Sequence, residues 1–207
     1  MPSKRQKPFR RPYAEALARR LAEPRRFMQV VTGARQVGKT TLVQQVTEGQ
    51  GLPVRFVSAD EPTLRDVGWL AEQWEAARFE VGSEGGILVV DEVQKVVNWS
   101  ESVKRLWDED TRKRRPLKVV LLGSAPLLVQ RGLTESLAGR FERLHLPHWP
   151  LAEMRDAFGF DAVRSATTGS SMDGWLNPRW APIWPMRHRA ASASCSTGES
   201  ATARWIS

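Results

Sequence analysis

The stretch Gly33-Ala-Arg-Gln-Val-Gly-Lys-Thr40 decides the fold, because it fits the Walker A pattern of a phosphate-binding loop, G-x-x-x-x-G-K-[ST]. Glycines let the backbone curl until successive N–H groups face one anion, and the helix that follows directs its N-terminus at the same point. We expect Lys39 to reach the β- and γ-phosphates of a nucleotide, and the Thr40 hydroxyl to bind Mg²⁺. The alternative is a glycine-rich turn that binds nothing.

The segments on either side of this stretch have the pattern that a phosphate-binding loop requires. Residues 27–32 form a short apolar run that is typical of a strand. Residues 39–47 place Leu42, Val43 and Val46 on one face of a helix. A strand before the loop and a helix after it favour nucleotide binding over an inert turn.

A Walker B pattern follows at residues 87–92. Residues 87–90 are continuously apolar, as in a strand at the middle of a parallel sheet, and Asp91 and Glu92 follow directly. In a sheet where this strand neighbours the strand before the loop, Asp91 lies beside the Mg²⁺ and holds it through water. Glu92 is then placed to polarise the water that attacks the γ-phosphate, as a general base. A loop start or a helix cap is the alternative for such an acidic pair.

Apolar runs and segments of helical period alternate from residue 27 to about residue 156. Further strands are predicted at 53–58, 117–122 and 143–146, and further helices from Tyr13, over 64–77, and after Asn98, which pairs with Glu101 in a capping pattern. This alternation predicts βαβ units, and hence an α/β fold whose parallel sheet binds ligands at the carboxyl ends of its strands.

Two polar residues further along the chain are candidates for the same site. Ser124 ends an apolar strand, where it would either report on the γ-phosphate or cap a helix that begins near Pro126. Arg140 follows the next helix, from where it can be offered to the nucleotide of a neighbouring subunit and stabilise charge in the transition state. A surface arginine without a catalytic role is the alternative for Arg140.

The net charge of +8 is distributed unevenly along the 207 residues. Residues 1–26 carry +7, residues 27–160 carry −1, and residues 161–207 carry +2. We therefore divide the chain into a basic N-terminal arm, a globular domain and a tail. The arm can hold a nucleic-acid backbone through counterion release, or it can be a solvated helix face with no partner.

The tail at 161–207 differs from the rest of the chain in composition. It holds eight Ser and eight Ala, only four residues of the types Leu, Ile, Val or Phe, and no Lys. Such a stretch cannot build a core of its own, so we expect it to be disordered or loosely docked.

Composition also excludes several classes of protein. No apolar run approaches the roughly 18 residues of a membrane span, and the basic N-terminus leads to no apolar signal region. A single cysteine, Cys195, excludes an internal disulfide framework and a cysteine-based zinc site. A cytoplasmic protein is the default expectation.

At these residues the chain resembles the AAA-type P-loop ATPases found as prokaryotic two-domain ATP-binding proteins. The resemblance covers roughly residues 10–160 and rests on five blocks in the family's order: Thr32-Gly-Ala-Arg-Gln-Val-Gly-Lys-Thr-Thr-Leu42, Val90-Asp-Glu-Val-Gln94, Asn98-Trp-Ser100 with Lys104-Arg-Leu-Trp-Asp108, Gly123-Ser124, and Ser136-Leu-Ala-Gly-Arg-Phe-Glu142. It implies a five-stranded parallel sheet in the order 5-1-4-3-2, with helices on both faces, and it implies ATP and Mg²⁺ as ligands.

The resemblance also assigns roles to individual residues. It implies nucleotide binding by Gly33, Ala34, Arg35, Gln36, Val37, Gly38, Lys39, Thr40 and Thr41. It makes Thr40 and Asp91 the magnesium ligands, Glu92 the catalytic acid, Ser124 the sensor, and Arg140 a catalytic finger that would act within a homo-oligomer.

Similar proteins continue past Asp161 into a long second domain. We therefore expect the tail to arise from a shifted reading frame that leaves a truncated product. Hydrolysis of Mg·ATP is the main functional hypothesis, favoured by the intact Lys39, Asp91 and Glu92. A non-catalytic nucleotide-binding module, or a remnant that lacks its second domain, is the alternative favoured by the tail. Nucleic-acid binding through the basic arm is a weaker alternative.

Overall fold

The computed structural model describes residues 9–60, 66–81, 84–124 and 136–159, which all belong to one compact unit, Met1–Phe160. Its elements in chain order are α1 (Tyr13–Ala22), β1 (Met28–Gly33), α2 (Lys39–Thr47), β2 (Val54–Ser58), α3 (Val67–Val81), β3 (Gly86–Asp91), the 3-10 turn η1 (Val93–Lys95), α4 (Trp99–Arg112), β4 (Leu117–Gly123), β5 (Phe141–Leu146) and α6 (Leu151–Phe158). The tail at 161–207, with its predicted disorder, lies outside the described residues.

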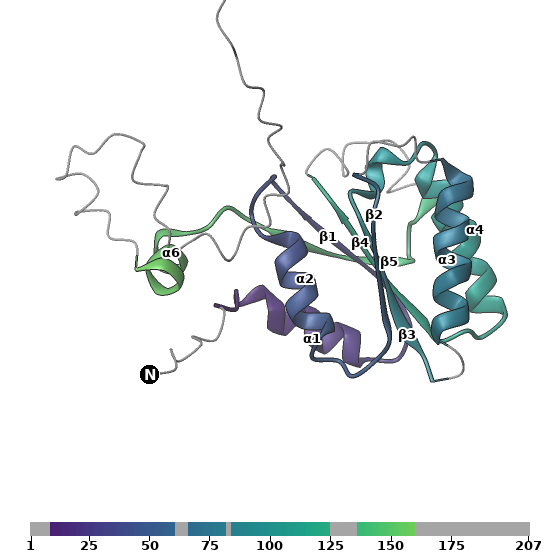
Figure 1. The fold of residues 1–207 in the computed structure, drawn as a ribbon, viewed down its shortest axis with the longest axis horizontal. Coiled ribbons are helices and arrows are strands. Elements are labelled where there is room, and N and C mark those ends of the chain that lie inside the picture. The colour runs from purple at the N-terminus through teal and green to yellow at the C-terminus, as the bar shows by residue number, and fades with distance from the viewer. Residues whose placement is uncertain (1–8, 61–65, 82–83, 125–135, 160–207) are drawn as a thin grey trace, which may run out of the picture. The chain divides into compact units, whose positions relative to one another are not determined.

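The five strands form one parallel sheet in the order β2-β3-β4-β1-β5 (Figure 1). This confirms the order 5-1-4-3-2 that the family resemblance implies, because the two orders are identical when they are read from opposite edges of the sheet. The middle strands β1, β3 and β4 are buried almost throughout, as their continuous apolar runs predict. Each predicted strand is present, with ends that differ from the prediction by up to two residues.

Helices cover both faces of the sheet, α1 and α2 on one face and α3 and α4 on the other (Figure 1). Alternating residues of one strand supply the two cores, since successive side chains point to opposite faces. In β1, Val30 packs with α3 and α4, and Val31 packs with α1 and α2. The helix predicted from Tyr13 is confirmed. Its buried residues Leu17 and Leu21 are part of the core between the sheet and helices α1 and α2.

Two details depart from the sequence-based expectation. Asn98 does precede α4, but its backbone is left-handed (φ 54°), and its side chain makes no capping hydrogen bond. Glu101 instead accepts a hydrogen bond from the Ser136 hydroxyl, so the predicted capping pair is wrong. Helix α6 was not predicted, although Leu151, Met154 and Phe158 recur at helical spacing, and none of its side chains is buried.

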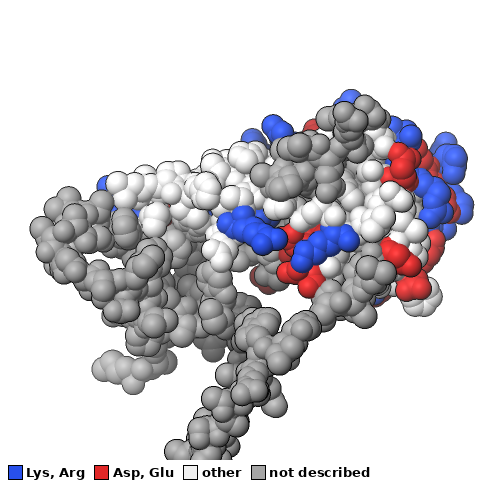
Figure 2. Space-filling view, turned by 90° about the horizontal axis from the view of Figure 1, so that it is seen from above, with Lys and Arg blue, Asp and Glu red and all other residues white. Residues whose placement is uncertain are grey.

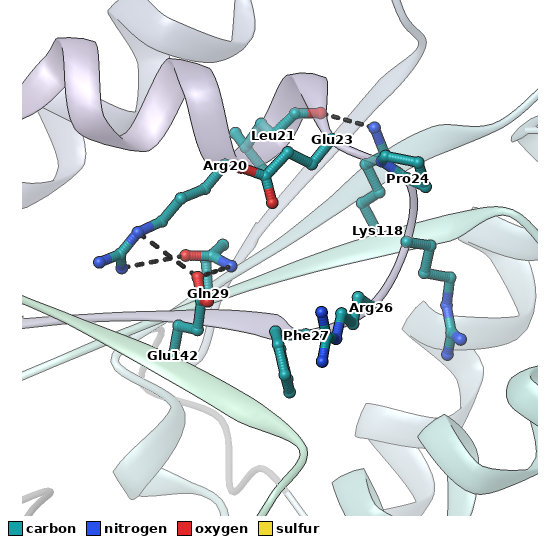
Figure 3. A pocket seen from close by; sticks show the side chains of 10 residues that line it. Arg20, Leu21, Glu23, Pro24, Arg26, Phe27, Gln29, Lys118 and Glu142 are labelled. Atoms are coloured by element: carbon teal, nitrogen blue, oxygen red, sulfur yellow. Dashed lines mark hydrogen bonds and ion pairs between the residues drawn. The ribbon is translucent and has the colours of Figure 1, made fainter.

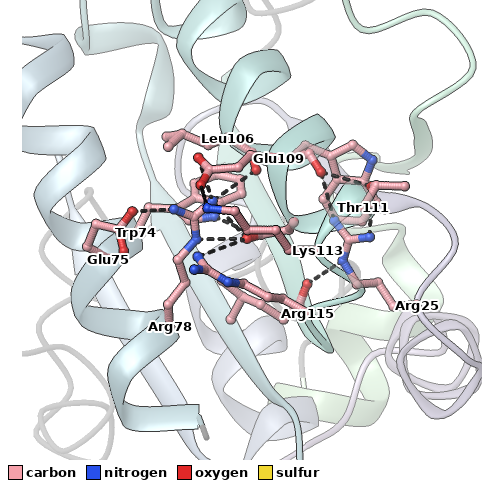
Figure 4. Close-up of polar contacts among 12 residues, drawn as sticks. Arg25, Trp74, Glu75, Arg78, Leu106, Glu109, Thr111, Lys113 and Arg115 are labelled. Carbon is pink, nitrogen blue, oxygen red and sulfur yellow. Dashed lines mark hydrogen bonds and ion pairs between the residues drawn. The ribbon is translucent and has the colours of Figure 1, made fainter. Parts of the chain in front are cut away.

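The buried carboxylate of Asp110 on α4 joins this helix to Trp74 and Arg78 of α3, two residues labelled in Figure 4. Asp110 is fully buried, and it accepts hydrogen bonds from Trp74 Nε1 at 2.8 Å and from Arg78 Nε at 2.7 Å. Burial by itself lowers the pKa of Arg78, but the charges and hydrogen bonds of Asp110 and Glu75 together outweigh this effect, and the pKa of Arg78 is raised. This charge cluster fixes the two helices that cover one face of the sheet.

Candidate functional site

The segment between β1 and α2 contains two glycines, Gly33 and Gly38, and a different structural constraint favours glycine at each position. A Cβ atom at Gly33 would collide with the backbone oxygen of Leu146 on the neighbouring strand β5. Gly38 has φ +85°, a left-handed conformation that disfavours other residues, and α2 begins immediately afterwards at Lys39. The loop thus ends at a helix N-terminus, which is a favourable place for an anion.

Lys39 is held over this loop and is only 6% exposed. Its Nζ donates hydrogen bonds to the backbone oxygens of Gly33, at 3.1 Å, and Ala34, at 2.8 Å. Burial lowers the pKa of Lys39, while Glu92 and Asp91 act in the opposite direction and raise it. A buried ammonium group therefore stands at the loop with two carboxylates in its surroundings.

The side chain of Thr40 connects the loop to the acidic pair. Its hydroxyl donates a hydrogen bond to Oδ2 of Asp91 at 2.7 Å. Asp91 ends β3, and β4 lies between β3 and β1, as the order implied by the family resemblance requires; the direct neighbourhood considered for the acidic pattern taken by itself is not realised. Thr40 lies in the first turn of α2, and its side chain bridges the gap that the intervening strand creates.

Glu92 lies at the same edge of the sheet in a left-handed conformation (φ 52°). Its backbone N–H donates to Oδ1 of Asp91 at 2.9 Å. The side-chain amide of Gln94 donates to the Glu92 carboxylate, and it makes a long 3.4 Å contact with the Ser124 hydroxyl. Ser124 is thereby connected to Glu92 through Gln94, a residue that sequence reasoning did not single out. The helix near Pro126 that Ser124 could cap lies outside the described residues.

Arg140 lies at the amino ends of the strands, whereas the loop lies at their carboxyl ends. Its backbone oxygen accepts a hydrogen bond from the N–H of Met28, which begins β1, whereas the loop follows the end of β1. Its guanidinium group pairs with Asp108 through two hydrogen bonds, of 2.7 and 3.0 Å. A hydrogen bond from Arg140 lowers the pKa of Asp108. The structure therefore does not bring Arg140 to the loop of its own chain.

The remaining loop residues differ in exposure. Arg35, Gln36 and Thr41 are exposed, so their side chains are available to a ligand, whereas Val37 is buried in the core beneath α2. Gln36 also has a left-handed backbone, with φ 64°. Among the residues that the structure describes, the loop, the end of β3, Gln94 and Ser124 thus form one connected polar site.

Comparison with known proteins places this chain in a family. Residues 25–155 match the family model described as an AAA domain. The chain belongs to the AAA domain family. By family and by fold it is an AAA-type P-loop ATPase domain.

Two solved structures are similar to this chain. A variant of Thermotoga maritima RuvB is 20% identical with a TM-score of 0.50, over 70% of this chain and 45% of that chain. A chain from work described as "Structural Basis for Katanin Self-Assembly" is 20% identical with a TM-score of 0.47, over 66% of this chain and 45% of that chain. The AAA chain thus spans less than half the length of either structure. No curated protein matches it.

Proposed function

We propose that this AAA domain binds Mg·ATP at the loop 33–40 and hydrolyses it with Glu92. The observation that supports the proposal most is the hydrogen bond between Thr40 and Asp91, because it joins the loop helix to the acidic pair. Lys39 directly precedes Thr40, and Glu92 directly follows Asp91 and donates its backbone N–H to the Asp91 carboxylate at 2.9 Å. A cation, a hydroxyl and two carboxylates are the set of groups that phosphoryl transfer to water requires.

The residues at this edge of the sheet fit a magnesium ion. Mg²⁺ prefers hard oxygen ligands and is bound by one or two protein groups together with water and phosphate oxygens. The Thr40 hydroxyl and the Asp91 carboxylate supply such oxygens 2.7 Å apart. When bound, the ion would neutralise negative charge on the β- and γ-phosphates. Thr40 and Asp91 are therefore the proposed magnesium residues.

The nucleotide would be held mainly by the backbone of the loop. Lys39 has a buried ammonium group that now binds two loop oxygens and would turn to the phosphates. The full set of proposed nucleotide-binding residues is Gly33, Ala34, Arg35, Gln36, Val37, Gly38, Lys39, Thr40 and Thr41.

Hydrolysis would depend on the carboxylate of Glu92. In the proposed step this carboxylate orients a water molecule and accepts its proton as the water oxygen attacks the γ-phosphorus. The bond between the γ-phosphorus and the β–γ bridging oxygen breaks, and ADP leaves with the electron pair of that bond. Gln94 holds the carboxylate by a hydrogen bond and also contacts Ser124, so Ser124 would sense the γ-phosphate next to the general base. Arg140 would act only on the nucleotide of a neighbouring copy, because it lies at the amino ends of the strands and the loop of its own chain lies at their carboxyl ends.

Equilibrium binding of ATP to the full chain, with and without Mg²⁺, tests the proposed site. We expect binding that Mg²⁺ strengthens and that Lys39→Ala weakens by about 10- to 100-fold, the range for loss of charge-assisted hydrogen bonds. Arg19→Ala is a matched control, because Arg19 is an exposed cation on α1. A folded protein that binds no ATP would overturn the proposal. Concentration-dependent turnover that Arg140→Ala abolishes, with ATP affinity unchanged, would support the finger role.

A non-catalytic nucleotide-binding module is the alternative within the same site. Two contacts favour it: Lys39 binds the oxygens of its own loop, and Arg140 is paired with Asp108. Under this alternative ATP binds with Mg²⁺ but is not hydrolysed at any protein concentration. A measurable turnover that depends on Glu92 would exclude it.

Nucleic-acid contact is a second candidate function, and one observation favours it. The segments that lead into the neighbouring parallel strands β1 and β4 lie at the same end of the sheet, at the amino ends of the strands, and both segments are basic. Arg26, Arg112, Lys113 and Arg114 are exposed there. Figure 3 shows Arg20, Arg26 and Lys118 around a hollow at this end, with Glu23 and Glu142 as the acids. On the face drawn in Figure 2, by contrast, Lys and Arg side chains lie beside Asp and Glu.

Fluorescence anisotropy with labelled duplex DNA tests this second candidate. Binding through phosphates should weaken steeply as the salt concentration is raised. In a plot of the logarithm of the binding constant against the logarithm of the salt concentration, removal of one phosphate contact should reduce the slope by about one. We expect Arg26→Gln and Arg114→Gln to show this, whereas Arg155→Gln on α6 should not. Absence of binding at low salt would contradict nucleic-acid contact.

A further inference from the structure

The Arg11 side chain joins three separate parts of the domain. Its Nε donates a 2.6 Å hydrogen bond to Oε2 of Glu153, which lies on α6. One terminal nitrogen donates to the backbone oxygens of Val37, at 3.1 Å, and Pro147, at 3.2 Å. The first oxygen belongs to the phosphate-binding loop, and the second belongs to the connection between β5 and α6.

Arg11 is also buried to an unusual degree for a residue of the basic N-terminal segment. Its side chain is 4% exposed, and Glu153 is 13% exposed. The ring of Trp149 lies 4.7 Å from its guanidinium carbon, and Trp149 also lies 3.8 Å from the position of a Cβ atom on Gly38. Burial of a cation is unfavourable unless the charge is paired and hydrogen-bonded. A solvated basic arm therefore does not account for this residue.

The contact with Val37 bears directly on the loop's ability to bind phosphate. The Val37 oxygen belongs to the peptide that joins Val37 to Gly38, the residue before α2. In a trans peptide the C=O and the following N–H point in opposite directions, and the described residues contain no cis peptide. Arg11 on the oxygen therefore directs the Gly38 N–H away from itself. A cation on the oxygen also polarises that N–H and makes it a stronger donor.

We propose that Arg11 is a positioning residue that fixes the Val37–Gly38 peptide for phosphate binding and couples its orientation to α6 through Glu153. The proposal rests on the proposed function, because it concerns the same nucleotide site. It makes ATP binding and the docking of α6 interdependent: each strengthens the other, since both depend on the same guanidinium group.

The neighbouring residue provides a matched control. Arg10 is exposed, and it donates a 3.0 Å hydrogen bond to the backbone oxygen of Gln45 on α2. The contacts described for Arg10 involve neither the loop nor α6. Arg10→Ala therefore removes an adjacent arginine of the same segment without touching the proposed coupling.

The experiment measures the ATP dissociation constant of the full chain for the unmodified protein, Arg11→Lys, Glu153→Gln and Arg10→Ala. Lysine keeps the charge but replaces the planar guanidinium group, whose separate nitrogens reach Glu153 and the two backbone oxygens, by a single nitrogen. Glutamine keeps the shape of Glu153 without its charge. We expect both changes to weaken ATP binding about tenfold, and Arg10→Ala to leave it unchanged. Thermal melts establish that each variant is folded.

Hydrogen exchange in α6 distinguishes the proposed coupling from a purely structural role of Arg11, because only the coupling makes the exchange rate depend on ATP. ATP should slow amide exchange at residues 151–158 in the unmodified protein and in Arg10→Ala, but not in folded Glu153→Gln. If ATP binds and the Arg11 and Glu153 variants bind it equally well, or ATP leaves exchange in α6 unchanged, the coupling is wrong and the proposed function stands. If the unmodified chain binds no ATP, both proposals fail.

Discussion

The Thr40 hydroxyl donates a 2.7 Å hydrogen bond to Oδ2 of Asp91, and this bond joins residues 51 positions apart in the sequence. One residue lies in the first turn of α2, and the other ends β3, with β4 between the two strands β1 and β3. The bond brings the phosphate-binding loop and the acidic pair into one site. It also gives the proposed magnesium site its two protein oxygens.

Loss of the Thr40 hydroxyl should affect only the magnesium-dependent part of ATP binding. We expect Thr40→Ala to lose about tenfold in affinity when Mg²⁺ is present, and to match the unmodified protein when the metal is chelated. Thr40→Ser, which keeps the hydroxyl, is the control. Calorimetry with and without a chelator measures both affinities, and an equal loss under both conditions would argue against the magnesium role.

The lowered pKa of Lys39 predicts a pH dependence of binding. Burial stabilises the neutral amine, so Lys39 loses its proton at a lower pH than an ordinary lysine, whose pKa is about 10.4. ATP affinity should therefore fall as the pH rises toward that value, because the cation that binds the phosphates is lost. Lys39→Arg stays charged and should show a flatter profile. A profile in which affinity rises with pH would contradict the proposed role of Lys39.

The amide of Gln94 should influence hydrolysis rather than binding. It donates to the Glu92 carboxylate and contacts Ser124, while the phosphate-binding loop is formed by other residues. We expect Gln94→Ala to slow turnover about tenfold and Gln94→Glu to slow it further, because a second carboxylate repels Glu92. Steady-state assays should show lower kcat with little change in KM. A change in KM alone would show that Gln94 does not position Glu92.

The parts of this site that were predictable from the sequence are those encoded locally. The loop pattern fixes the start of α2 at Lys39, and the apolar run before Asp91 marks a buried strand, so both were predicted within a residue. The order of the strands came from the family resemblance and not from the residues themselves. Local patterns carry this information because a helix or strand depends on the spacing of neighbouring residues.

The parts that were not predicted depend on contacts between distant segments. Arg11 contacts residues 26 and 142 positions away, and in the sequence it is one arginine of a basic arm. Gln94 was quoted in a motif, but its importance arises only when β4 brings Ser124 beside it. No periodicity or spacing marks such residues, because their role is set by the packing of the finished fold.

Asp110 should be a major contributor to stability. Removal of one partner from a buried ion pair leaves the other charge unpaired, so we expect Asp110→Ala to lower the free energy of unfolding by about 3–5 kcal/mol. Glu109→Ala removes a neighbouring carboxylate that is partly exposed, and it should lower the free energy of unfolding far less than Asp110→Ala does. Denaturant titration measures both values. Similar values for the two variants would show that the cluster does not stabilise the α3–α4 pair.

The most direct test of the central proposal compares the unmodified chain with Glu92→Gln, measuring ATP affinity and hydrolysis on the same samples. The proposed general base predicts that Glu92→Gln binds Mg·ATP with nearly unchanged affinity and hydrolyses it at least about 100-fold more slowly. Equal turnover by the two proteins, or loss of ATP binding together with turnover, would contradict the assignment of Glu92 as the residue that activates water.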